Sequence, residues 1–301
     1  MLSAMWYRQG YINMKVTVIG PICKDEIIMK GKSHFQSGGV TYYTGEALAS
    51  LGVDVTILGS FGDEKKDWLS NWKCKKIVHI KKEDTIKFIN VYPEKNPDIR
   101  IQKAHIAPNQ IRIQDIQEET VNDANFIILG PLFHDNLDQA LVEKLSKYAP
   151  LVLAPQGLIR YLDGEKIVWK NRENVLRLLP YIEYLFLNEE ELRFISDQEG
   201  VQEGAAFLQK KGAKNVIATL GQRGSWLFLG HKEYKIKAFP SKELVDPTGA
   251  GDSYMAGFIQ ALSLFKDPIK QGEFAAMTAT ITIENKGPSN ASQGEVIQRL
   301  D

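Results

Sequence analysis

The chain has 301 residues, of which 44% are apolar and 25% are charged, a balance typical of a globular protein with a substantial core. Its 37 Lys and Arg residues equal its 37 Asp and Glu residues, so it lacks the basic excess of a dedicated nucleic-acid-binding protein. No apolar run approaches the roughly 18 residues of a transmembrane helix, so we expect neither nucleic acid nor membrane as a partner.

The N-terminal segment and the cysteines indicate a cytoplasmic protein. Met1 to Asn13 lack the continuous apolar core and the cleavage site of a secretory signal. We expect residues 1–13 to be an added or mis-started leader, with Met14 as a candidate natural start, and residues 14–301 to form a single domain. Cys23 and Cys74 do not have the spacing of a metal or redox pair, which fits a reducing cytoplasm.

From Met14 onward, short β-prone runs alternate with helical segments, the pattern of an α/β fold with a mostly parallel sheet between two layers of helices. The expected strands are Val16–Ile19, Val53–Leu58, Phe126–Leu129, Leu151–Ala154, Tyr184–Leu187, Asn215–Thr219 and Ser225–Phe228. Glycines or polar residues follow several of them, at the carboxyl edge where open α/β sheets bind ligands. We expect the chemistry at that edge.

Two stretches, residues 24–37 and 77–106, do not fit the alternation. They contain β-prone runs such as Thr85–Tyr92 and Arg100–Ile106, and the turn-rich residues 93–98 indicate a hairpin loop between these two runs. The stretches can pair into a small separate sheet, or they can form an edge hairpin with no function. Periodicity alone does not separate the two alternatives.

Gly38 and Gly39 precede a short amphipathic helix that Gly52 ends. Two glycines before a helix permit a ligand to approach the backbone closely, although a plain loop-to-helix turn has the same pattern.

Further along, Asn188 to Glu191 follow an expected strand and open another helix. An asparagine N-cap with acidic residues that offset the helix dipole explains that run by itself.

The most informative run is Asp246-Pro247-Thr248-Gly249-Ala250-Gly251-Asp252. Gly249, Ala250 and Gly251 leave their backbone N–H groups accessible at the start of an expected helix, whose dipole favours an anion such as a phosphate. Asp252, in the first turn, is expected to stay ionised at neutral pH and to act as a base. The helix is predicted from apolar residues at three- and four-residue intervals, namely Met255, Phe258, Ile259, Leu262 and Phe265. The alternative is an ordinary helix start whose aspartate only offsets the dipole.

These residues resemble the signature of the ribokinase-like (PfkB) carbohydrate kinases, Asp-Thr-x-Gly-Ala-Gly-Asp followed by a helix rich in small residues. Pro247 is the one departure, because it replaces a hydroxylated residue. The resemblance covers the chain from Val16 to Gly287 and implies a three-layer α/β fold with a small β lid over the sugar site, built from the stretches 24–37 and 77–106. It implies a phosphotransferase with Asp252 as the catalytic base and with Gly249, Ala250 and Gly251 in the anion hole.

The resemblance also implies the remaining site residues. Asp25 with Gly38 and Gly39 would bind acceptor hydroxyls, although Val40-Thr41 replaces the common Lys-Gly of this motif. The segment Ala154 to Arg160 is similar to Asp-x-Gln-Gly-x-x-Arg of a branch that includes inositol kinases, which adds Gln156 to the acceptor site and favours a sugar or cyclic polyol. ATP and Mg²⁺ are the implied cofactors. Residues expected to contact the nucleotide or its metal are Asn188, Thr219, Gly221, Gly224, Thr248, Ala276 and Gly287, with Glu191 and Asp246 on the metal side.

Three further expectations concern function. Some family members bind K⁺ through loops equivalent to Asp246, Thr248 and Gly287, so K⁺ is a candidate cofactor. Exposed lid strands could pair with a second copy, which makes a homodimer plausible. A nucleoside kinase on the same fold and a non-catalytic nucleotide or metabolite sensor are the alternatives to a sugar or polyol kinase, and a sensor would be expected to lack the base that Asp252 provides.

Overall fold

A parallel sheet whose strands alternate with helices forms the centre of the molecule. The computed structural model describes residues 14–29, 32–63, 71–92, 101–105 and 108–301. The predicted leader, residues 1–13, and the predicted hairpin loop, residues 93–98, lie outside this part of the chain. The strand order in the large sheet is β15-β14-β13-β12-β9-β8-β1-β4-β5, and the strands from β13 to β5 run parallel. β14 and β15 are antiparallel additions at one edge.

The strands of this sheet are short and mostly buried. They are β1 (Lys15–Pro21), β4 (Asp54–Phe61), β5 (Lys76–Lys81), β8 (Phe126–Leu129), β9 (Leu151–Leu153), β12 (Ile182–Asn188), β13 (Asn215–Thr219), β14 (Ser225–Leu229) and β15 (Lys232–Ile236). Their apolar side chains alternate between the two faces, so each face packs against a different core cluster.

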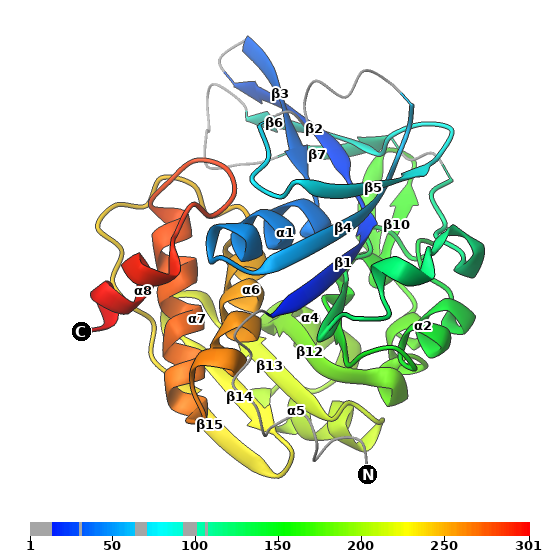
Figure 1. Cartoon of the computed structure of the whole chain (residues 1–301). Helices are drawn as coiled ribbons and strands as arrows, with labels where there is room; N and C mark the ends of the chain where they lie inside the picture. Colours follow the sequence, from blue (N-terminus) through cyan, green and yellow to red (C-terminus); the bar gives the residue numbers. More distant parts are fainter. Residues whose placement is uncertain (1–13, 30–31, 64–70, 93–100, 106–107) are drawn as a thin grey trace.

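Helices cover both faces of the sheet, which gives the expected three layers (Figure 1). One layer holds α1 (Val40–Ser50), α6 (Ala250–Leu264), α7 (Pro268–Ile283) and α8 (Gln293–Leu300). The other holds α2 (Gln139–Leu145), α4 (Glu189–Ser196) and α5 (Val201–Lys210), with the short α3 (Glu173–Leu176) beside them. The predicted α/β fold class, a mostly parallel sheet between two layers of helices, is confirmed. In the described residues no helix is long and apolar enough to cross a membrane.

A second sheet of six strands stands at the carboxyl edge of the first, in the order β10-β11-β7-β6-β2-β3 (Figure 1). Its strands are β2 (Cys23–Met29), β3 (Lys32–Gly38), β6 (Lys87–Tyr92), β7 (Ile101–His105), β10 (Arg160–Asp163) and β11 (Lys166–Trp169). β1 leads almost directly into β2, so the two sheets are joined where the ligand edge was expected.

The structure differs from the sequence prediction at two places. Residues 77–81 lie in β5, which pairs with β4 in the large sheet, so they are not part of the small sheet. After β9, a 3₁₀ helix (Pro155–Ile159) leads into β10 and β11, which are not among the predicted strands.

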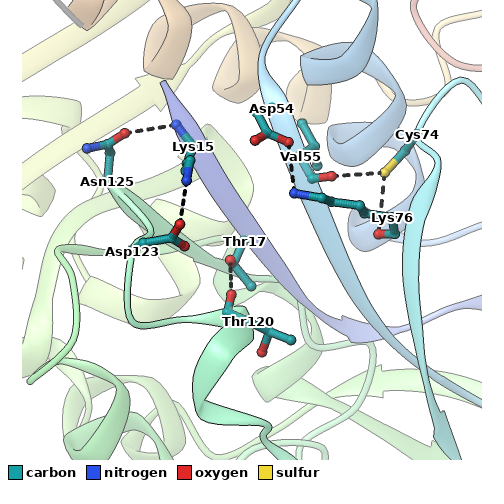
Figure 2. Close-up of polar contacts among 9 residues, drawn as sticks. All are labelled: Lys15, Thr17, Asp54, Val55, Cys74, Lys76, Thr120, Asp123 and Asn125. Carbon is teal, nitrogen blue, oxygen red and sulfur yellow. Dashed lines mark hydrogen bonds and ion pairs between the residues drawn. The ribbon is translucent and has the colours of Figure 1, made fainter. Parts of the chain in front are cut away.

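The opposite, amino-terminal edge of the sheet is fixed by polar contacts (Figure 2). At the start of β1, the Lys15 amide donates to Asn125 Oδ1 (2.8 Å), and its ammonium group pairs with Asp123. The Thr17 hydroxyl donates to the Thr120 carbonyl at 2.6 Å. These contacts tie the loop before β8 to β1 and leave the carboxyl edge as the open end of the sheet.

Candidate active site

The glycine-rich turn before α6 has the conformation that the anion-site prediction requires. Gly249 is the N-cap of α6, with a left-handed φ of 77°. The first helical hydrogen bond runs from the Ser253 amide to the Gly249 carbonyl (2.9 Å), so the amides of Gly251 and Asp252 precede the regular helical bonds. The Ala250 amide instead donates to the Pro247 carbonyl at 3.3 Å. A Cβ on Gly251 would have no atom within 4 Å, so open space lies beside this turn.

Asp246 stabilises the same turn from the preceding side. Its Oδ1 accepts a hydrogen bond from the Thr248 amide at 2.9 Å, which closes an Asx turn. Its own amide donates to the Ile283 carbonyl at the end of α7 (3.2 Å). Hydrogen bonds within the chain therefore fix the turn, and one Asp246 oxygen is used for that purpose.

Asp252 is half-buried in the first turn of α6, and its environment differs from the one expected. Burial and the neighbouring Glu191 carboxylate raise the pKa of Asp252 to about 7, and Arg160 only partly opposes them. The prediction that the helix dipole keeps Asp252 fully ionised at neutral pH is therefore wrong. A carboxyl group with a pKa near neutrality is well suited to accept a proton in catalysis.

Glu191 belongs to a capping box at the start of α4. Its amide donates to Asn188 Oδ1 (2.9 Å), while its two carboxylate oxygens accept hydrogen bonds from the Asn188 amide (3.1 Å) and from Asn188 Nδ2 (2.9 Å). Gln156 also donates a side-chain hydrogen bond to Glu191, and burial raises the pKa of the Glu191 carboxyl group. The capping interpretation is confirmed. The metal role of Glu191 and the acceptor role of Gln156 stay predictions.

Three of the predicted acceptor residues, Asp25, Gly38 and Gly39, come together where β2, β3 and α1 meet. The Cys23 thiol donates to Asp25 Oδ1 on β2 at 3.3 Å. Gly38 leaves room for the same carboxylate, because a Cβ there would lie 2.5 Å from Asp25 Oδ2. Gly39 is the N-cap of α1, with a φ of 97° that favours glycine. These contacts hold Asp25 at the junction of the two sheets.

A cavity of about 770 Å³ lies on the other side of the glycine-rich turn. It reaches Ala250 and Gly251 at the start of α6, and four predicted nucleotide residues line it: Thr219, Gly221, Gly224 and Ala276. Much of the remaining wall is apolar and comes from residues that the sequence did not single out, namely Ala238, Phe239, Pro240, Leu244, Ala279 and Ile283. Asn188, Thr248 and Gly287 are not among the residues that line this cavity.

Arg160 is a second feature that sequence reasoning did not place in the site. It stands at the start of β10, and its positive charge acts on Cys23, Glu191 and Asp252, which lie on β2, α4 and α6. The only signal in the sequence was its position in the segment Ala154 to Arg160. Its charge offsets part of the repulsion between the two neighbouring carboxylates.

The model of the pfkB family carbohydrate kinases matches residues 10–294. The chain belongs to this family. Membership agrees with the predicted enzyme class, a phosphotransferase with an alcohol group as acceptor. Among curated proteins, a nucleoside kinase of Methanocaldococcus jannaschii is 30% identical over 147 residues. The match covers 48% of each chain, so it spans about half the length of that relative.

Solved structures of the ribokinase family share the fold of this pfkB family member. A pyrophosphate-dependent kinase complexed with a pyrophosphate analog and myo-inositol superposes with a TM-score of 0.81 at 22% identity, covering 94% of this chain and 99% of the other. The ribokinase of Arabidopsis thaliana, complexed with ribose and ATP, gives a TM-score of 0.75 at 20% identity over 96% and 99% of the two chains. At these identities the likeness shows the fold alone.

Proposed function

We propose that this protein is an ATP-dependent kinase that transfers the γ-phosphoryl group to a hydroxyl of a sugar or cyclic polyol, with Asp252 as the general base. One observation carries the proposal: a large cavity ends at the glycine-rich turn of α6, and Asp252, with a pKa of about 7, follows that turn directly. The cavity for the donor, the backbone amides that bind the transferred group and the Asp252 base thus lie next to one another, as phosphoryl transfer requires.

The chain's own residues divide the work. The amides of Gly251 and Asp252, with Gly249 shaping the turn, stabilise the charge that develops on the transferred group. Asp252 takes the proton of the acceptor hydroxyl while the acceptor oxygen bonds to phosphorus and the bond to the leaving phosphate breaks. Asp25, with Gly38 and Gly39, binds other hydroxyls of the acceptor, and Gln156 orients Glu191. The product is a phosphate ester, and ADP leaves.

The metal role that we propose is indirect. Hydrogen bonds from Asn188 already occupy both Glu191 oxygens, so Glu191 suits an ion that keeps its water shell. Among the described residues no cluster of three or more His, Cys, Asp or Glu side chains could hold a metal. Mg²⁺ would arrive with the nucleotide and neutralise phosphate charge when bound. A K⁺ ion near Asp246, Thr248 and Gly287 stays a prediction.

The wall of the cavity supports a nucleotide donor over pyrophosphate, the donor of the pyrophosphate-dependent structural neighbour. Phe239, Ala276 and Ile283 offer an apolar surface suited to a purine ring, and pyrophosphate has no group to fill it. Thr219, Gly221 and Gly224 also line the cavity and would contact the ribose and the phosphates. The same cavity would serve a nucleoside kinase, which the relative from Methanocaldococcus jannaschii makes the second candidate.

The proposed setting is the cytoplasm, where ATP is available and where the two buried free thiols, Cys23 and Cys74, stay reduced. A homodimer through the small sheet is supported by its edge. β3 is an outer strand of that sheet, so its edge can pair with another strand. It exposes Phe35, whose ring centroid lies 4.5 Å from Lys24 Nζ.

An ADP-release screen with ATP tests the proposal over pentoses, hexoses, inositols, keto-deoxy acids and nucleosides, with pyrophosphate as the competing donor in a parallel assay. A specific sugar or polyol with ATP supports it, a nucleoside supports the second candidate, and turnover with pyrophosphate alone contradicts the donor. Asp252→Asn should retain nucleotide binding and lose about 10²–10⁴ in turnover. Ala276→Phe should raise the KM for ATP and leave the acceptor KM unchanged, because it fills the apolar end of the cavity.

A further inference from the structure

The 770 Å³ cavity proposed to hold the phosphoryl donor is called the donor cavity below. One of its walls is a segment without helix or strand, residues 237–249, between β15 and α6. It contributes Phe239, Pro240, Ser241, Leu244 and Pro247 to the cavity. Leu244 is 61% exposed, so packing of its side chain does little to fix this part of the segment. Phe239 packs against the core on one side, so polar contacts are needed mainly to position the part of the wall around Leu244.

The polar contacts come from the last turns of α7, where the Thr280 hydroxyl donates to the Phe239 carbonyl at 3.5 Å. Glu284 is the C-cap of that helix, and its Oε1 accepts a hydrogen bond from the Lys242 amide at 2.8 Å. The Ile283 carbonyl accepts from the Val245 amide at 2.8 Å and from the Asp246 amide at 3.2 Å. The segment between β15 and α6 is thus attached at its middle to Glu284 and near its end to Ile283.

Glu284 is in turn held by α8. Arg299 makes a bidentate pair with it, from Nη1 to Oε2 at 2.6 Å and from Nη2 to Oε1 at 2.9 Å. The two side chains are only 17% and 11% exposed, and α8 is seated by Val296, which is fully buried. The hydrogen bonds from Arg299 lower the pKa of the Glu284 carboxyl group below its usual value, which keeps the pair charged at neutral pH.

We propose that Arg299 and Glu284 are positioning residues for the phosphoryl donor: their ion pair fixes the segment 237–249 against α7 and so sets the affinity for the nucleotide. Neither residue lines the cavity or belongs to the predicted site. The effect passes through the Lys242 amide to the part of the wall that carries Leu244. The inference rests on the proposed function, because it concerns the donor site of that function.

The test compares Glu284→Ala, Glu284→Gln, Arg299→Met and Arg299→Lys with the wild type. Titration calorimetry with a non-hydrolysable ATP analogue gives the Kd, and steady-state assays give KM for ATP and for the acceptor. Glu284→Ala and Arg299→Met should raise the Kd and the KM for ATP about tenfold, the scale of one charge-assisted hydrogen bond. Glu284→Gln keeps an acceptor for the Lys242 amide, and Arg299→Lys keeps a charge. The Kd and the KM for ATP of these two variants should therefore lie between those of the wild type and those of Glu284→Ala and Arg299→Met. The acceptor KM should not change.

A matched control is Arg193→Met, which removes an exposed pair with Glu199 (3.0 Å) on another face. This variant should leave the Kd for the ATP analogue and the KM values for ATP and for the acceptor unchanged. Trypsin gives a second readout that needs no ligand, because Lys242 is an exposed cleavage site in the segment. Cleavage after Lys242 should be faster in Glu284→Ala and Arg299→Met than in the control, at temperatures where circular dichroism shows all of them folded.

The outcomes separate the two claims. A wild type that neither binds nor turns over ATP refutes the proposed donor. A wild type that binds ATP, with variants that bind it equally well, overturns the inference and leaves the kinase function standing. Equal loss of affinity for donor and acceptor also overturns it, because that pattern reports a general structural defect. Unchanged tryptic cleavage after Lys242 contradicts the attachment itself, whatever the donor is.

Discussion

Gly249 lies directly against the ring of Tyr43, so close that a Cβ on Gly249 would stand 2.4 Å from Tyr43 Cδ1. Tyr43 lies on α1, the helix that follows Gly38 and Gly39 of the predicted acceptor site. Gly249 is the N-cap of α6, at the proposed anion site. The contact therefore sets the spacing between the acceptor and the donor halves of the site. It also explains in steric terms why glycine stands at this position.

We predict that Gly249→Ala removes most of the activity. A side chain at φ 77° costs about 1–2 kcal/mol by itself, and the clash with Tyr43 forces the turn to shift. Gly52→Ala is the matched control, because Gly52 has a φ of 87° and no atom within 4 Å of a Cβ. Thermal unfolding and kcat/KM should be measured for both. Both variants should lose stability, Gly249→Ala by more because of the clash, and only Gly249→Ala should lose most of its activity. Equal activity in the two variants would contradict the steric argument.

The rate should depend on pH through Asp252. This group acts as a base in its deprotonated form and has a pKa of about 7, so kcat/KM should rise with pH and level off above about pH 8. Initial rates at saturating Mg²⁺, from pH 5.5 to 9, measure this limb. A flat profile over this range, as expected for a carboxyl group with the usual pKa of 3.8, would contradict the role of Asp252 as a base that titrates near pH 7.

The same shift predicts that Asp252→Asn stabilises the protein at high pH. The folded-state pKa lies above the usual 3.8, so the folded chain holds a proton that the unfolded chain releases between about pH 4 and pH 7. The contribution of Asp252 to the free energy of unfolding therefore falls as the pH rises through this range, and asparagine removes that loss. The Tm of Asp252→Asn should exceed that of the wild type at pH 8, with a smaller difference at pH 5. A lower Tm at pH 8 would argue against a buried, repelled carboxylate.

Much of the fold follows from local patterns. β8 and β13 occupy the predicted residues, because each is a short apolar run between polar or glycine-containing turns. β10 and β11 are not among the predicted strands, since they are short and half polar, although Gly164 and Glu165 form a two-residue hairpin turn between them with Gly164 at a φ of 60°. Whether a β-prone run such as β5 joins the large or the small sheet depends on long-range pairing, which periodicity does not encode.

The candidate site also has parts that the local sequence predicts and parts that depend on the tertiary fold. The turn from Asp246 to Asp252 is a local structure, and its glycines and aspartates predict it. The apolar wall of the donor cavity and the pKa of Asp252 are tertiary properties. Glu191 and Arg160, which oppose each other in setting that pKa, come from α4 and β10, and only the folded chain brings them to α6.

Arg160 offers the sharpest test of this electrostatic arrangement. Its positive charge lowers the pKa of Asp252 against the effects of burial and Glu191, so Arg160→Met should move the acid limb of kcat/KM to higher pH. Activity should fall several-fold at pH 7 and recover toward pH 9, where Asp252 is deprotonated in both proteins. Arg160→Lys keeps the charge and should leave the limb near its wild-type position. If Arg160 only contacted the acceptor, Arg160→Met would lower kcat/KM by the same factor at every pH, and that profile would contradict the proposed influence on the base.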